Sequence, residues 1–106
     1  MSEDRGPDSL DAHVRRMFKD LGLMAYHTRT SVGSAKGFPD WTIVGIRVMF
    51  RELKTQRGKL TSAQRDWLEA LHTAGADADV WRPEDLLNGR IAHELAALAG
   101  LTAGAA

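Results

Sequence analysis

Residues 37–56 read GFPDWTIVGIRVMFRELKTQ, and this stretch decides how the rest of the chain is interpreted. Two runs of β-branched, aromatic and apolar residues, 41–44 and 48–54, predict two strands with a glycine between them. Asp40 precedes the first run, and Glu52 and Lys54 lie near the end of the second. Because burying an unpaired carboxylate or ammonium group is costly, these charges are expected to have a partner or a metal.

The two runs are expected to pair as a hairpin. If its turn centres on Ile46, Asp40 lies opposite Glu52, since the two residues are equally far from the turn. Side chains alternate along a strand, so Glu52 and Lys54 share one face while Leu53 points to the other. The expectation depends on register, because a slip of one residue would turn every side chain to the opposite face. The pattern therefore predicts two carboxylates and an ammonium group at one end of the hairpin.

The rest of the chain predicts a small α/β domain with helices covering a central mixed sheet, in the order αβββαβα. The second hairpin strand has apolar residues at both odd-numbered and even-numbered positions, as a central strand covered on both faces would. The remaining elements follow from apolar spacing, caps and turn residues: a helix over 10–21 capped by Ser9, a strand over 23–28, a helix from Thr61 or Ser62 to Gly75, a strand over 78–81, and a helix from Pro83 or Glu84 that breaks near 88–89 and resumes over 90–98.

Composition places the chain among single-domain globular proteins. It has 106 residues, of which 43% are hydrophobic and 26% charged. It contains no cysteine, so disulfides and zinc–thiolate sites are excluded, and a cytoplasmic location is expected. The polar N-terminus is unlike a signal peptide. We expect a disordered tip over residues 1–8, one domain over 9–99 and a flexible tail over 100–106.

Charge is unevenly distributed although the formal net charge is zero. Between residues 47 and 65 the chain carries many cations, and Glu52 is the only acid. This segment is either a solvated charged face or a surface that binds phosphates. The candidate nucleic-acid-binding residues are Lys36, Arg47, Arg51, Arg57, Lys59 and Arg65.

Two carboxylates held close together repel each other unless a proton or a cation lies between them. Mg²⁺ (or Mn²⁺) takes oxygen ligands and usually retains waters, and a neighbouring lysine can hold a water or a phosphate oxygen. Such a group can hydrolyse a phosphodiester. The alternative is structural: an aspartate at a strand start after Pro39 and a surface Glu–Lys pair. The hairpin register and the basic segment together favour the metal site.

These residues resemble a known family. Gly37-Phe-Pro-Asp40, Glu52-Leu-Lys54 and Gln64 resemble the PD-(D/E)XK nuclease superfamily, and within it the VRR-NUC (virus-type replication-repair nuclease) family. The turn Gly58-Lys59-Leu60 and a glutamine on the following helix extend the match, which covers about residues 31–81. Several motifs in the same order make the resemblance more specific than a single Pro-Asp or Glu-x-Lys.

The resemblance implies a restriction-endonuclease-like α/β core and a role for each matching residue. Asp40, Glu52 and the backbone carbonyl of Leu53 would bind Mg²⁺ or Mn²⁺. Lys54 would orient the attacking water and stabilise charge, and Gln64 would position water or a phosphate.

The resemblance also implies a metal-dependent endonuclease that hydrolyses DNA phosphodiesters. Small stand-alone members are often phage-encoded, which would place the protein in a bacterial cytoplasm, and some resemble Holliday-junction resolvases that act as homodimers. No base-reading motif is evident, so structure-selective cutting in phage replication, recombination or repair is expected. The alternatives are a catalytically silent nucleic-acid-binding or assembly module, and a restriction-type or RNA-directed nuclease.

Two residues have competing interpretations. Related nucleases carry a further acid on the first helix, for which Asp8 and Asp11 are candidates, although Asp11 also suits the first turn of a helix. Gln64 and Thr61 fit a capping box, which is an alternative to a role in the site. The four histidines, His13, His27, His72 and His93, lack metal-ligand spacing and are assigned to the surface or to packing.

Overall fold

The computed structural model describes residues 9–29 and 35–101. The expected tip over residues 1–8 lies outside this part of the chain, as does most of the expected tail. The elements are α1 (Leu10–Asp20), β1 (Met24–His27), β2 (Trp41–Val44), β3 (Val48–Leu53), α2 (Ser62–Thr73), β4 (Asp77–Trp81), α3 (Pro83–Leu87) and α4 (Arg90–Leu98).

The four strands form one mixed sheet in the order β1-β2-β3-β4. β2 pairs antiparallel with both β1 and β3, and β4 pairs in parallel with β3. Trp41 lies opposite Arg51, and Val44 lies opposite Val48. This register confirms that the hairpin turn centres on Ile46. Asp40 and Glu52, one residue beyond the Trp41–Arg51 pair, therefore meet at the same level.

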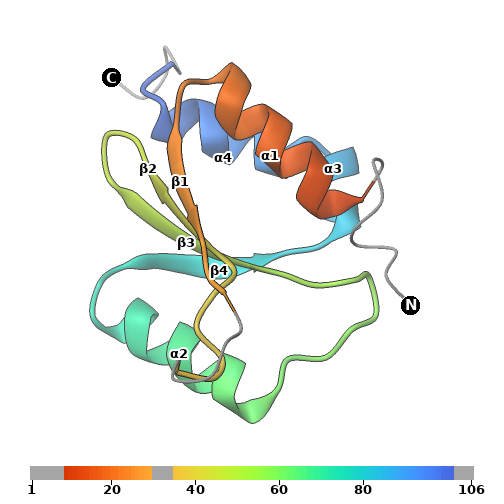
Figure 1. Ribbon diagram of the computed structural model, residues 1–106, viewed down its shortest axis with the longest axis vertical. Coiled ribbons are helices and arrows are strands. Elements are labelled where there is room, and N and C mark those ends of the chain that lie inside the picture. The colour runs from red at the N-terminus through yellow and green to blue at the C-terminus, as the bar shows by residue number, and fades with distance from the viewer. Residues whose placement is uncertain (1–8, 30–34, 102–106) are drawn as a thin grey trace.

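Helices cover both faces of the sheet, as predicted for a central β3. Figure 1 shows α1, α3 and α4 on one side and α2 on the other. The ring of Trp41 packs edge-on against Phe18 of α1, with their centroids 5.0 Å apart. Phe50 reaches α2 through Phe38, whose ring lies 5.0 Å from that of Trp67. We call these two sides of the sheet the α1 face and the α2 face.

The main hydrophobic core lies on the α1 face, between the sheet and α1 and α4. Its members include Trp41 and Trp81. Burying an apolar side chain of this size stabilises the fold by about 1.5–3 kcal/mol. The least exposed members are Val14, Ile43, Met49, Trp81, Ile91, Leu95 and Leu98.

Local signals set the helix ends. The Ser9 hydroxyl accepts a hydrogen bond from the Ala12 backbone N–H at 3.1 Å, which confirms the predicted cap of α1. Gly89 adopts a left-handed φ of 85° and separates α3 from α4, at the predicted break. The last helical segment is therefore two helices. No helix in the described residues is long and apolar enough to cross a membrane.

Candidate active site

The turn before β2 is anchored on the start of α2. Gly37 has a φ of 87°, and a Cβ there would lie 2.4 Å from the backbone carbon of Ala63. Only glycine fits so close an approach without displacing the helix. Phe38 then packs between Phe50 and Trp67, with ring centroids 5.9 and 5.0 Å away. These contacts hold the turn against α2.

Asp40 is fixed by both neighbouring strands. The Thr28 backbone N–H donates to the Asp40 carbonyl at 2.8 Å, and the Thr28 hydroxyl donates to the carbonyl of buried Pro39 at 2.6 Å. The Asp40 Oδ2 atom accepts the Leu53 backbone N–H at 2.7 Å. The carboxylate therefore lies against the backbone of β3, beside Glu52.

Glu52 is a buried acid on the α2 face, and its side chain is only 3% exposed. Burial raises the pKa of its carboxyl group to about 8, and the negative charge of Asp40 and a hydrogen bond with it add to the shift. Lys54 acts in the opposite direction, so its positive charge is close to Glu52. Without a cation, the Asp40–Glu52 pair therefore retains a proton near neutral pH.

Gln64 caps α2, as one of its two interpretations predicted, and it also contacts Glu52. Its Oε1 atom accepts the Thr61 backbone N–H at 2.9 Å, and its own backbone N–H donates to the Thr61 hydroxyl at 3.1 Å, which completes the capping box. Its Nε2 atom donates to Glu52 Oε2 at 3.0 Å. One amide group therefore caps α2 and orients the Glu52 carboxylate.

The arrangement fits a hard divalent cation. Among the described residues, no group of three or more His, Cys, Asp or Glu side chains is placed to hold a metal ion. A cation at this site would therefore rely on two carboxylates, a backbone carbonyl, waters and substrate oxygens. Mg²⁺ is commonly bound by one or two carboxylates together with substrate phosphates. The predicted set of Asp40, Glu52 and the Leu53 carbonyl has this composition.

Five of the six predicted phosphate-binding cations are exposed, and four of these five lie near the carboxylate pair in the sequence or the fold. Lys36 lies beside the anchored turn, and Arg65 lies in the first turns of α2. Arg57 and Lys59 belong to the segment that follows Lys54. All four lie in segments that adjoin the residues of the site.

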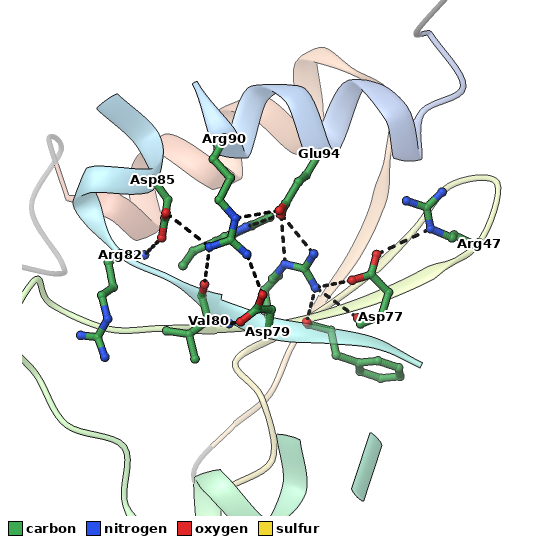
Figure 2. Close-up of polar contacts among 11 residues, drawn as sticks. Arg47, Asp77, Asp79, Val80, Arg82, Asp85, Arg90 and Glu94 are labelled. Carbon is green, nitrogen blue, oxygen red and sulfur yellow. Dashed lines mark hydrogen bonds and ion pairs between the residues drawn. The ribbon is translucent and has the colours of Figure 1, made fainter. Parts of the chain in front are cut away.

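The structure corrects the prediction for Arg51. Its side chain is 3% exposed on the α1 face, where it pairs with Asp77 at 2.9 Å and with Glu94 at 3.1 Å. Figure 2 labels Asp77 and Glu94 and draws the contacts that they make in this network. A guanidinium group buried there is not available to a nucleic-acid phosphate. Strand alternation places the side chains of Arg51 and Glu52 on opposite faces.

Arg47 is exposed but lies at the far end of the hairpin. Its Nε atom is 3.6 Å from Asp77 Oδ2 (Figure 2). Glu52 is five positions further along the chain, a distance of roughly 16 Å along a strand. Any phosphate contact that it makes would therefore be remote from the carboxylate pair.

Asp11 and His27 contact Trp41, whose ring lies on the α1 face. Asp11 Oδ1 accepts the Trp41 indole N–H at 3.0 Å, and its Oδ2 pairs with Arg15. The His27 ring centroid is 4.7 Å from that of Trp41. These contacts give both residues packing and hydrogen-bonding roles. Asp8 lies outside the described residues.

Sequence analysis missed Arg82, which fixes the segment after Lys54. Its guanidinium group donates to the carbonyls of Thr55 at 2.6 Å and Gly58 at 2.7 Å. The Gln56 side chain in turn accepts the Glu84 backbone N–H at 2.9 Å, at the start of α3. These bonds join segments more than 20 residues apart, so no local sequence signal marks them.

Comparison with known proteins agrees with the motifs. No model of a protein family matches this sequence, and no curated protein matches it. A solved structure described as a VRR_NUC domain protein is similar to it, with a TM-score of 0.51 and 25% sequence identity. The match covers 63% of this chain and 63% of that one, slightly less than two thirds of each. The sheet, its flanking helices and this likeness confirm the predicted restriction-endonuclease-like α/β fold and the resemblance to the VRR-NUC nucleases.

Proposed function

We propose that the protein is a metal-dependent endonuclease that hydrolyses phosphodiester bonds in DNA. The observation that carries the proposal is the pairing of Asp40 with Glu52 on adjacent strands, in a setting that raises the pKa of Glu52 to about 8. Two neighbouring acids repel each other once both are ionised, and a bound cation removes that repulsion. Lys54 on the same face supplies the positive charge that phosphate chemistry needs.

Asp40, Glu52 and the Leu53 carbonyl would hold Mg²⁺ or Mn²⁺, which when bound neutralises the phosphate and lowers the pKa of a coordinated water. The Lys54 ammonium group donates to the attacking water or to a phosphate oxygen. The water oxygen forms a bond to phosphorus and loses a proton to solvent, while the bond from phosphorus to the leaving sugar oxygen breaks and that oxygen takes a proton from solvent. Lys54 stabilises the negative charge that develops, and Gln64 keeps the Glu52 carboxylate oriented.

The proposed substrate is branched DNA. Lys36, Arg57, Lys59 and Arg65 would contact phosphates, which positions a nucleic acid without reading its sequence. A four-way junction has two scissile strands related by approximate two-fold symmetry, so a homodimer would suit it. Such an activity fits phage replication, recombination or repair, the setting that the VRR-NUC resemblance implies.

The test is cleavage of a labelled four-way junction, with linear duplex, single-stranded DNA and RNA alongside, in Mg²⁺, in Mn²⁺ and in EDTA. Asp40→Asn serves as the inactive variant. Asp66→Asn is the matched control, because Asp66 is an exposed acid on α2 outside the carboxylate pair. We expect metal-dependent cutting of the junction by the wild type and by Asp66→Asn, and at least a roughly 100-fold loss in Asp40→Asn.

Each other result revises a defined part of the proposal. Equal cutting of all DNA substrates keeps the nuclease and removes the preference for branches. Cutting of RNA alone assigns an RNA-directed enzyme. Binding without cutting in either metal contradicts the proposed activity and assigns a silent binding module.

A further inference from the structure

Residues 55–60 join β3 to α2 and contain neither helix nor strand. We call this segment the β3–α2 loop. It begins directly after Lys54, and α2 with Gln64 follows it. The loop carries two exposed cations, Arg57 and Lys59, which we call the loop cations. It therefore connects two elements of the candidate active site and presents positive charge between them.

Arg82 binds the backbone of this loop. Its Nη1 atom donates to the carbonyls of Thr55 at 2.6 Å and Gly58 at 2.7 Å, and it lies 3.4 Å from that of Gln56. Within the loop, the Gly58 backbone N–H also donates to the Thr55 carbonyl at 3.2 Å. Hydrogen bonds from a charged donor are stronger than neutral ones. One guanidinium group therefore fixes both ends of this turn.

Two further contacts bind the loop to the same side of the molecule. The Lys54 backbone N–H donates to the Trp81 carbonyl at 3.0 Å, which extends the pairing of β3 with β4 to the start of the loop. The Gln56 side chain accepts the Glu84 backbone N–H at 2.9 Å. The loop is thus attached to the end of β4 and to the start of α3.

The charge of Arg82 is directed at the loop rather than at an acid. Figure 2 shows that its backbone meets Asp85, to which its N–H donates at 2.8 Å, while its guanidinium group points away from Arg90 and Glu94. Among the described residues, no carboxylate forms an ion pair with Arg82. Carbonyl oxygens of the loop therefore take the place that acids occupy around Arg90.

We infer that Arg82 is a positioning residue for DNA binding, because it holds the β3–α2 loop in the conformation in which the loop cations meet phosphates beside the carboxylate pair. The inference rests on the proposed function for the identity of the ligand, and on the carbonyl contacts for the role of Arg82. A loop that is ordered before DNA arrives loses less conformational entropy on binding. Arg82 acts through the loop and does not itself contact a phosphate.

Positioning and phosphate contact differ in their salt dependence. Each cation that neutralises a phosphate of duplex DNA contributes about 0.9 to the slope of log affinity against log salt concentration. Arg57→Ala should therefore lower the slope by about 0.9. Arg82→Met keeps both loop cations but releases the loop. We expect it to weaken binding roughly tenfold at every salt concentration and to leave the slope unchanged.

The measurement is fluorescence anisotropy of a labelled linear duplex in EDTA, from about 50 to 200 mM salt. Arg90→Met is the matched control, because Arg90 is a partly buried arginine that also donates to a backbone carbonyl, that of Val80 at 3.2 Å, but not to the loop. Its affinity for DNA should equal that of the wild type. Circular dichroism should show that each variant is folded at the temperature of the assay.

A double-mutant cycle tests whether Arg82 acts through the loop cations. In protein that carries Arg57→Ala and Lys59→Ala together, Arg82→Met should cause no further loss of affinity, because no loop cation remains to be positioned. Additive losses would overturn the inference, as would a slope that falls by about 0.9 in Arg82→Met itself. Wild-type affinity in Arg82→Met would overturn it too.

Gln56→Ala provides the test if Arg82→Met does not fold. It removes only the contact with the Glu84 backbone and changes no charge. We expect roughly threefold weaker binding with the slope unchanged. Wild-type affinity in Gln56→Ala would then overturn the inference.

Binding in EDTA and cleavage in metal fail separately. Protein that cuts no DNA in Mg²⁺ or Mn²⁺, but binds it with the expected loss in Arg82→Met, would remove the nuclease and keep the positioning role. Protein that cuts DNA, with wild-type affinity in Arg82→Met, would do the reverse.

Discussion

Arg51 and Glu52 are consecutive residues of β3 with equally buried side chains, yet they enter opposite environments. On the α1 face, Arg51 is matched by acids: it pairs with Asp77 and with Glu94. On the α2 face, Glu52 lies beside another acid, Asp40. One strand therefore carries a balanced charge cluster on one side and an unbalanced one on the other.

The pKa values of Glu52 and Glu94 shift in opposite directions because of this difference. Burial opposes ionisation of both, and it raises the pKa of Glu52 to about 8 with the charge of Asp40 adding to the effect. Burial acts on Glu94 as well, but hydrogen bonds from Trp81 and Arg90 and the charge of Arg51 outweigh it and lower the pKa. Glu94 is therefore stabilised as a carboxylate by the protein itself.

The imbalance on the α2 face concerns charge rather than hydrogen bonding. Among the described residues, every buried side-chain nitrogen and oxygen has a hydrogen-bond partner. Glu52 accepts from Gln64, and Asp40 accepts from the Leu53 backbone. The comparison teaches that Arg51 is surrounded by opposite charges at ion-pair distance, whereas Glu52 lies beside a like charge that Lys54 offsets only in part.

The largest expected effect comes from breaking the balanced side. Arg51→Met removes the guanidinium group and leaves Asp77 and Glu94 without their buried partner, so we expect a loss of about 3–5 kcal/mol in the free energy of unfolding. Chemical denaturation measures it. Arg47→Ala is the control, because this exposed arginine also approaches Asp77 and should cost less than about 1 kcal/mol. Equal losses in the two variants would contradict the account.

The unbalanced side should make metal-free stability depend on pH. The folded-state pKa of Glu52, about 8, exceeds its usual value of 4.5. The contribution of the Glu52 carboxyl group to the free energy of unfolding is therefore fully present below about pH 4.5. This contribution, on the order of a few kcal/mol, is lost as the pH rises through about 8. Denaturation of metal-free wild type and Glu52→Gln at about pH 5, 7 and 9 isolates this residue. Parallel stability curves for the two proteins would refute the prediction.

Smaller effects should separate the two contacts of Gln64. Thr61→Ala removes only the cap and should lower stability by about 0.5–2 kcal/mol while cleavage by the folded protein persists. Gln64→Glu keeps the cap acceptor but replaces the donor to Glu52 with a third negative charge, so cleavage by the folded protein should fall. Denaturation and single-turnover cleavage of both variants test this. Loss of cleavage in Thr61→Ala alone would contradict the assignment.

Sequence patterns predicted the features that local rules control. The hairpin register followed from the position of Ile46, and the caps at Ser9 and Thr61 followed from their own side chains. The meeting of Asp40 with Glu52 was therefore predictable. Alternation along β3 would also have excluded Arg51 from the nucleic-acid-binding residues, had it been applied to that residue as it was to Leu53.

Other features depend on contacts between distant segments. Arg82 reaches Thr55 and Gly58 because β4 pairs in parallel with β3, and nothing near Arg82 in the sequence marks that pairing. The acids that pair with Arg51 belong to β4 and α4, at least 26 residues further along the chain.

The most direct test of the unbalanced pair is proton release on metal binding. Mg²⁺ is added to metal-free protein at about pH 7 in a pH-stat, and the base needed to hold the pH is recorded for wild type, Glu52→Gln and Asp66→Asn. With the pKa of Glu52 at about 8, wild type and Asp66→Asn should release close to one proton per site, and Glu52→Gln none. Saturating Mg²⁺ binding by the wild type without proton release, or equal release by Glu52→Gln, would contradict the account.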